Sequence, residues 1–214
     1  MNRFLDFEQE LEKIENQINN LDIKKNNYNI EKNKLIEKKN ISLKKIYSNL
    51  SAWDKVQVAR HPNRPHSIDY INSIFTNIVY LHGDKKFSDD NAILGCLAKI
   101  NDTSVVIIGT EKGNTMESRI KHNFGMAKPE GYRKAQRLMN LANKFNLPII
   151  TFVDTAGAFP GKDAEERGQS ESIASSILVS LKINTPIISI VIGEGGSGGA
   201  IALATADKVL MLEH

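Results

Sequence analysis

The chain has 214 residues, a formal net charge of +3 at pH 7 and a single cysteine. This length is enough for one domain with a substantial hydrophobic core and a smaller appendage. The low net charge argues against a dedicated nucleic-acid-binding protein, and one cysteine excludes a disulfide framework or a cysteine-based metal site. No apolar stretch approaches the roughly 20 residues of a transmembrane helix. Because the N-terminus also has no apolar signal-peptide core, we expect a cytoplasmic protein.

The first 50 residues differ from the rest, because they are rich in Lys, Asn, Glu and Ile and contain neither Gly nor Pro. Their apolar residues recur with the heptad spacing that is typical of packed helices. This apolar seam comprises Phe7, Leu11, Ile14, Ile18 and Leu21, and the spacing resumes at Leu43, Ile46 and Leu50. The Asn-rich segment 24–29 predicts a break between two helices. We therefore predict a helical hairpin over residues 1–55, which packs on the main domain (residues 56–214) or on another subunit.

The main domain follows a Pro-punctuated linker at residues 59–65. The pattern after this linker predicts a short helix over residues 67–71. The apolar runs 93–100 and 105–109 predict two paired strands joined by an Asn-Asp turn. Cys96 lies in the first of these strands, so we expect a buried and unreactive thiol.

Residues 112–131 are predicted to form a long polar loop, and a helix with one apolar face is predicted to follow it. That face comprises Ala135, Leu138, Met139 and Ala142. Basic residues are frequent across the loop and the helix, namely Arg119, Lys121, His122, Lys128, Arg133, Lys134 and Arg137. These basic residues either guide an anionic substrate to the site or form a solvated helix face with subunit contacts, and the second interpretation is favoured.

Two glycine-rich loops follow buried strands in the last third of the chain. The apolar run 148–153 leads into the first loop, Asp154–Gly161, and a helix is predicted over residues 164–181. The apolar run 186–190 leads into the second loop, Val191–Ala200, where a further helix begins. Consecutive strand–loop–helix units imply a parallel sheet, in which ligands bind beyond the carboxyl ends of the strands. Both glycine loops should therefore lie at one edge of the sheet, near one site.

The second glycine loop admits several chemical interpretations. Backbone N–H groups at a helix N-terminus lack helical partners and can bind a phosphate or a developing oxyanion. Gly193–Gly198 satisfies the dinucleotide pattern G-x-G-x-x-G, with Glu213 downstream. Gly195–Gly199 formally matches the nucleophile elbow G-x-S-x-G, although only His214 follows it. A P-loop is excluded because G-x-x-x-x-G-K-[ST] does not occur, and close helix–strand packing is the remaining alternative.

Several motifs together carry a resemblance to a known family. They are Phe4–Glu8, Ala59–Pro65, His122–Met126, Pro129–Lys134, Asp154–Gly161, Ala164–Ser170 and Val191–Ala200. In this order they resemble the alpha subunits of bacterial acetyl-coenzyme A carboxylase carboxyltransferases, over residues 4–214. The resemblance implies an α/β fold of the crotonase-like (ClpP/crotonase) type, with repeated ββα units after the N-terminal hairpin. Because that family continues past His214, we expect the chain to lack a C-terminal part and to be inactive alone.

The resemblance implies transfer of a carboxyl group from carboxybiotin to acetyl-CoA, which gives malonyl-CoA, in the first committed step of fatty acid synthesis. It assigns the catalytic oxyanion hole to the backbone N–H groups of Gly198 and Gly199. Substrate contacts are expected from Gly157, Ala158, Phe159, Pro160, Gly161, Gly195 and Gly196. Replacement of either catalytic glycine with Val is expected to abolish transfer and to leave the fold nearly intact.

The resemblance also implies partners. The biotin is carried on a separate carrier protein, a separate biotin carboxylase component uses ATP, and a beta subunit completes an alpha2beta2 heterotetramer. Zinc is expected only in that beta subunit, and no metal is expected in this chain. The alternatives are another crotonase-fold acyl-CoA enzyme (a hydratase or decarboxylase), for which Glu165–Glu166 is the only candidate Glu pair, and an NAD-binding module.

Overall fold

The computed structural model describes residues 4–24 and 26–214. The chain divides into two compact units, one that extends to Asn63 and includes His214, and one that comprises Arg64–Glu213. The domain boundary predicted between residues 55 and 56 falls inside helix α3 (Ala52–Ala59). The division in the structure therefore comes after this helix, within the Pro-punctuated linker.

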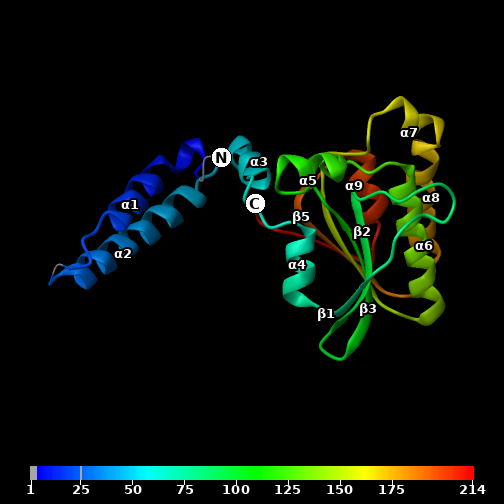
Figure 1. Cartoon of the computed structure of the whole chain (residues 1–214), viewed down its shortest axis with the longest axis horizontal. Coiled ribbons are helices and arrows are strands. Elements are labelled where there is room, and N and C mark those ends of the chain that lie inside the picture. The colour runs from blue at the N-terminus through cyan, green and yellow to red at the C-terminus, as the bar shows by residue number, and fades with distance from the viewer. Residues whose placement is uncertain (1–3, 25) are drawn as a thin grey trace. The chain divides into compact units, whose positions relative to one another are not determined.

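The N-terminal unit contains the predicted helical hairpin, with α1 (Gln9–Asn19) packed on α2 (Tyr28–Tyr47) and a 3-10 turn at Asp6–Glu8 (Figure 1). Leu11 and Ile14 of the predicted seam are each 2% exposed.

The seam prediction is partly wrong in the second helix. Leu43 is 42% exposed, whereas its neighbour Ser42 is buried and Lys39 forms an ion pair with Glu15 of α1. The face of α2 that meets α1 therefore runs through positions 39, 42 and 46, so half-buried Ile46 fits the predicted seam and Leu43 does not. This face carries polar groups, which a purely apolar pattern cannot detect.

The C-terminal unit is built on a six-stranded sheet whose spatial order follows the sequence. The strands are β1 (Thr76–Tyr80), β2 (Ile93–Ile100), β3 (Thr103–Thr110), β4 (Ile149–Thr155), β5 (Ile187–Gly195) and β6 (Lys208–Met211). The first three strands pair antiparallel, and β3 to β6 pair parallel. The paired strands and the parallel sheet predicted from the apolar runs are confirmed.

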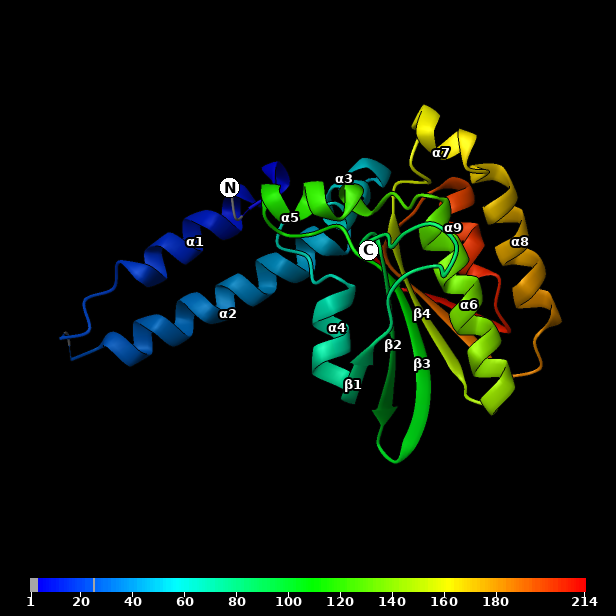
Figure 2. The same ribbon diagram turned by 45° about the vertical axis from the view of Figure 1, so that its right-hand side comes forward.

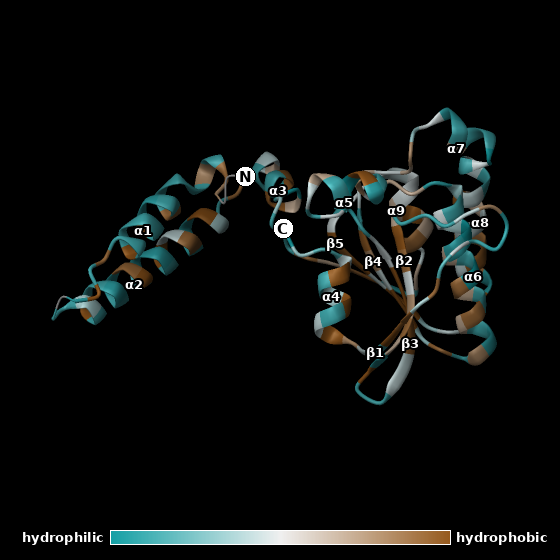
Figure 3. Ribbon diagram, viewed as in Figure 1, coloured by the Kyte–Doolittle hydropathy of each residue, from teal (hydrophilic) through white to brown (hydrophobic). Residues whose placement is uncertain are grey.

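Helices cover both faces of this sheet (Figure 2). The helices α6 (Pro129–Phe145), α8 (Gln169–Lys182) and α9 (Ser197–Ala204) lie on one face, and α4 (Ser67–Ile74) lies on the other. The four apolar residues predicted for one face of α6 are each fully buried, and Figure 3 shows the apolar strands between the more polar outer helix surfaces. In the described ranges, no helix is long and apolar enough to cross a membrane.

The second hydrophobic cluster lies between the sheet and α4. The ring of Phe152 stacks on Tyr70 at 5.7 Å between centroids and meets the edge of Phe75. Cys96 belongs to this cluster and is fully buried, which raises the pKa of its thiol to about 12. The thiol is therefore protonated and unreactive at neutral pH, as expected.

Two helix boundaries differ from the prediction. The segment expected to be a polar loop contains α5 (Met116–Lys121), which begins where the Thr115 side chain accepts the Ser118 N–H, and a 3-10 turn at Asn123–Gly125. The helix predicted over residues 164–181 is two helices, α7 (Lys162–Glu166) and α8, because Gly168 between them has φ +83°. A short capped helix in a polar stretch has too little apolar periodicity to be recognised.

Basic residues of α6 bind the loop between β1 and β2. Arg133 forms an ion pair with Asp84 at 2.8 Å, and Lys134, only 2% exposed, forms one with Asp89 at 2.5 Å. Arg137 donates to the carbonyl of Gly83 at 3.0 Å. The favoured interpretation of these residues as a solvated face is therefore wrong for this part of the helix, where they hold a loop.

We expect this loop to make stability depend on acid pH. Burial opposes ionisation of Asp84, but the N–H groups of Phe87 and Lys86 and the Arg133 guanidinium outweigh it and lower the pKa from 3.8 to about 2. A carboxylate with a lowered folded-state pKa stabilises the fold above its unfolded pKa and loses this effect as the pH falls through the folded value. Urea denaturation should therefore show a loss of stability between about pH 4 and pH 2.

The substitution Asp84→Asn should reduce that loss, because it removes the titrating group. The exposed turn residue Asp102 provides the matched control, and Asp102→Asn should leave the pH dependence unchanged. An identical pH dependence for Asp84→Asn and the parent chain would contradict the assignment.

Candidate functional site

The two glycine loops meet at the carboxyl ends of β4 and β5, as predicted. Thr155 at the end of β4 is the register partner of Gly195, and its carbonyl accepts the N–H of Gly196 at 2.8 Å. The Thr155 hydroxyl is 2.6 Å from the carbonyl oxygen of Gly125 and 2.8 Å from that of Gly157. One residue thus connects the first loop, the second loop and the turn before α6.

The loops approach each other too closely for side chains at the contact. A Cβ on Gly199 would lie 2.6 Å from the carbonyl carbon of Gly157 and 2.8 Å from the nitrogen of Ala158, and a Cβ on Gly196 would collide with the carbonyl of Ala156. Gly199 is therefore required for packing, and the expectation that Val at this position leaves the fold nearly intact is wrong.

Gly198 differs from Gly199 in this respect. A Cβ on Gly198 would make ordinary contacts with Ile173 of α8 at 3.5 Å. A side chain at position 198 therefore starts toward α8, so a bulky replacement is a poor test of any function of the N–H group.

The N-terminus of α9 presents unused backbone donors. The strand turns sharply into the helix at Ser197, which has φ +53°, and the Ala200 N–H donates to the Gly196 carbonyl at 3.1 Å. The N–H groups of Gly198 and Gly199 precede this first helical bond, so they point outward from the helix end. The arrangement can bind a carbonyl oxygen or an oxyanion.

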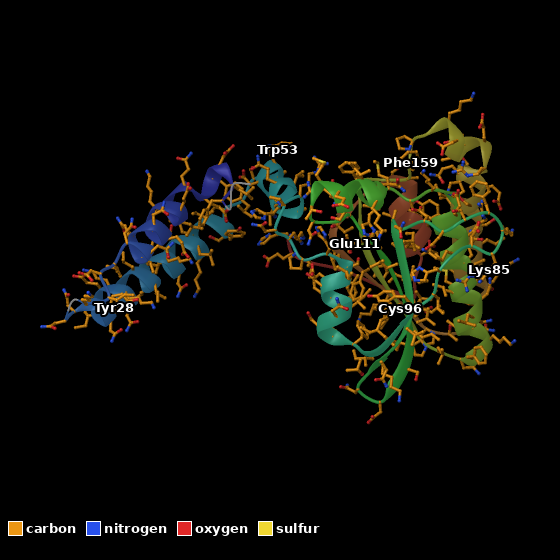
Figure 4. All side chains as sticks on the ribbon, in the orientation of Figure 1. Tyr28, Trp53, Lys85, Cys96, Glu111 and Phe159 are labelled. Atoms are coloured by element: carbon orange, nitrogen blue, oxygen red, sulfur yellow. The ribbon has the colours of Figure 1, made fainter. Side chains whose placement is uncertain are left out.

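The first loop is fixed mainly through its backbone. The Phe159 N–H donates to the carbonyl of Ala127 at 3.0 Å. The side-chain amide of Gln169 donates to the carbonyl of Ala127 at 2.9 Å and to that of Phe159 at 3.0 Å. Phe159 is half-buried beneath the ammonium group of Lys128, which lies 4.8 Å from the ring centroid. Figure 4 shows Phe159 and Glu111 toward one end of the sheet, whereas Cys96 lies within it.

Sequence reasoning missed a charged cluster at the same edge. Lys112 lies 2.7 Å from Asp154 and 2.7 Å from Glu194, and Asp154 also accepts the N–H of Glu194 at 2.8 Å. Gly193 is needed here, because a Cβ would collide with the Asp154 carboxylate. Each of these charged residues ends or follows one of three adjacent strands, and this shared position was the signal that could have found them.

A second buried pair lies beside this cluster. Glu111 is 2% exposed and accepts the N–H groups of Ile68 and Gly113, and His66 Nδ1 lies 3.1 Å from its carboxylate. Burial opposes ionisation, but the His66 contact and both N–H groups outweigh it and lower the pKa of Glu111. Arg64 donates to the carbonyl of Ile192 at 2.6 Å, so it supports the strand that leads into the second loop.

The other sequence candidates do not converge on the glycine loops. Glu165 and Glu166 are exposed on α7, where Glu166 forms an ion pair with exposed Lys162 at 3.5 Å. The described residues contain no group of three or more His, Cys, Asp or Glu side chains that is placed to hold a metal ion.

Comparison with known proteins identifies what the chain is similar to. Residues 4–214 match the family model described as acetyl co-enzyme A carboxylase carboxyltransferase-like. Curated relatives include acetyl-coenzyme A carboxylase carboxyl transferase subunit alpha from Rhodospirillum centenum, which is 55% identical over 99% of this chain and 68% of its own length. The Agrobacterium fabrum protein of the same name is 52% identical over 100% of this chain and 69% of its own length.

Solved structures of carboxylating enzymes share the fold. The transcarboxylase 12S structure with hydrolysed methylmalonyl-coenzyme A matches 74% of this chain and 29% of its own, with a TM-score of 0.60 and 21% identity. The beta subunit of Pseudomonas aeruginosa geranyl-CoA carboxylase matches 67% of this chain and 25% of its own, with a TM-score of 0.54 and 19% identity. The crotonase-like fold predicted from the sequence is confirmed.

The packing difference between the two glycines predicts opposite effects of Ala on stability. Gly199→Ala should lower the free energy of unfolding by about 1–3 kcal/mol, because its Cβ has no space beside the first loop. Gly198→Ala is the matched control one residue away, and it should leave stability unchanged or raise it by up to about 1 kcal/mol, since Ala favours the helix. Urea denaturation of both variants measures the difference, and equal effects would show that the loops do not pack as described.

Proposed function

This chain belongs to the acetyl co-enzyme A carboxylase carboxyltransferase-like family, and on that premise we propose that it is a carboxyltransferase subunit of acetyl-CoA carboxylase. The reaction moves a carboxyl group from carboxybiotin to acetyl-CoA and forms malonyl-CoA, the first committed step of fatty acid synthesis. The observation that carries the proposal at the level of the site is the pair of N–H groups of Gly198 and Gly199, which precede the first helical hydrogen bond, at the junction of two glycine loops.

These donors suit the chemistry of the reaction. Bound carboxybiotin supplies the activated carboxyl group, and both the thioester carbonyl oxygen and the ureido oxygen are positions where negative charge develops. Backbone N–H groups that are fixed before the reaction stabilise such charge without reorganising. The positive end of the α9 dipole adds to their effect.

The remaining loop residues would shape the space in front of the donors. Gly195 and Gly196 leave the backbone bare beside the α9 N-terminus, and residues 157–161 form the opposite wall, with Phe159 half-buried and Pro160 exposed. We assign substrate contacts to these two segments. The network of Lys112, Asp154 and Glu194 holds the end of β5, so it would fix the geometry of the donors.

The proposed assembly follows the family. A beta-type subunit would supply the remaining half of the site together with its own zinc, and the biotin would arrive on a carboxyl carrier protein after an ATP-dependent carboxylase has loaded it. The proposed assembly is alpha2beta2, and the proposed location is cytoplasmic. The chain spans 68% and 69% of the length of two curated relatives, and we propose the activity for the whole protein in that complex.

Removal of one donor without a change in shape tests the proposal. Replacement of Gly198 with glycolic acid exchanges its N–H for an ester oxygen. The helix loses no hydrogen bond, because the first hydrogen bond of α9 is donated by the Ala200 N–H, further along the chain. In the complete complex, carboxybiotin-dependent formation of malonyl-CoA should fall by about 10²- to 10³-fold in kcat. Gly198→Ala, which retains the N–H, serves as the control and should keep most of the activity.

Two results would count against the proposal. Unchanged kcat in the ester variant would show that the Gly198 N–H does not stabilise the transition state. Hydration or decarboxylation of an acyl-CoA by the parent complex, without formation of malonyl-CoA, would favour the alternative class of crotonase-fold enzyme.

A further inference from the structure

A buried tyrosine points at the same helix N-terminus. Tyr132 lies in the first turn of α6, is 1% exposed and belongs to the hydrophobic core beneath the sheet face that α6 and α9 cover. Its hydroxyl oxygen lies 2.9 Å from the position that a Cβ on Gly199 would occupy. The glycine therefore admits the phenol as well as the backbone of the first loop.

The hydroxyl of Tyr132 is not used inside the protein. Across residues 4–24 and 26–214, it has no hydrogen-bond partner. Its oxygen is also not among the fully enclosed polar atoms that lack a partner in the described residues, so it keeps some access to space outside the protein. Tyrosine hydroxyls usually find a hydrogen-bond partner. An unpaired hydroxyl against Gly199, at a helix end with unpaired N–H groups, indicates a position where an oxygen atom from outside the chain completes the hydrogen bonds.

The phenol is held in the form that can donate. Burial raises the pKa of Tyr132, and the nearby negative charge of Asp90 raises it further. The hydroxyl is therefore protonated throughout the neutral pH range. It is a neutral donor of the same kind as the two N–H groups.

We propose that Tyr132 is a catalytic residue whose hydroxyl donates a third hydrogen bond, beside the N–H groups of Gly198 and Gly199, to a substrate carbonyl oxygen that gains negative charge. This inference rests on the proposed carboxyltransferase function. The oxygen belongs to a cyclic urea, as in biotin, or to a CoA thioester, because both present a carbonyl that becomes an oxyanion. The ring has little freedom to move within the core, so the donor is positioned before the substrate binds.

The first experiment removes the hydroxyl alone. Tyr132→Phe in the complete complex should lower kcat for malonyl-CoA formation by about 100-fold, the lower end of the loss expected for one oxyanion donor, with little change in KM. Tyr70→Phe is the matched control, because Tyr70 stacks its ring on Phe152 in the other core cluster and should tolerate loss of its hydroxyl. Parent-like kcat for Tyr132→Phe would overturn the proposal.

The second experiment does not depend on turnover or on loss of the hydroxyl. A 3-fluorotyrosine placed at position 132, and separately at position 70, reports on its surroundings through its fluorine resonance. Titration with free biotin in one arm and with acetyl-CoA in the other should shift the signal at position 132 and not at position 70. The arm that produces the shift identifies which carbonyl the hydroxyl meets.

The two experiments separate the possible failures. If the parent complex makes no malonyl-CoA, the proposed function fails, and the fluorine titration still decides whether Tyr132 meets a ligand carbonyl. If Tyr132→Phe does not fold, the fluorotyrosine protein decides in the same way. A resonance at position 132 that neither ligand shifts would overturn the inference.

Discussion

The close contact between the start of α9 and the loop after β4 is the constraint on which the site depends. At this contact backbone meets backbone, since a Cβ on Gly199 would lie 2.6 Å from Gly157 and a Cβ on Gly196 would overlap Ala156. The short distance brings the α9 N-terminus, the first loop and the Tyr132 hydroxyl to one point. Because Gly196 uses its N–H to bind Thr155, the next donors along the chain are the ones that remain available.

Buried charges hold the ends of the strands that carry this contact. Isolated buried ion pairs add little to stability, and removal of one partner is costly. The Lys112–Asp154–Glu194 cluster is consistent with a positioning role, because Asp154 binds both the ammonium group and the backbone N–H of Glu194. Glu111, which directly follows β3, also fixes backbone, because it accepts two backbone N–H groups and faces His66. Carboxylates thus fix backbone at two adjacent strand ends.

The sequence predicts those parts of the fold that depend on local pattern. Apolar runs mark β2 to β5, and glycine clusters after two of them place both loops at one edge. The features that sequence reasoning missed depend on contacts between distant segments. Lys112 and Glu194 are 82 residues apart, and the approach of Tyr132 to Gly199 requires α6 and α9 to be packed already. The ion pair between Lys39 of α2 and Glu15 of α1 was missed for a related reason, since a pattern of apolar residues contains no information about ion pairs.

The charge of the candidate site favours a developing oxyanion over a bound anion. Lys112, the cation beside the second loop, already pairs with two carboxylates. At the N-terminus of α9 itself, the groups that can meet a substrate oxygen are neutral donors, namely two backbone N–H groups and, by our inference, one phenol, whereas the Lys128 ammonium lies over Phe159 of the first loop. Neutral donors bind a ground-state carbonyl weakly and gain strength as its oxygen becomes negative, whereas a free ammonium group would also bind stable carboxylates and phosphates tightly. Such a site binds the transition state more strongly than the ground state, which is the requirement for moving a carboxyl group between two carbonyl compounds.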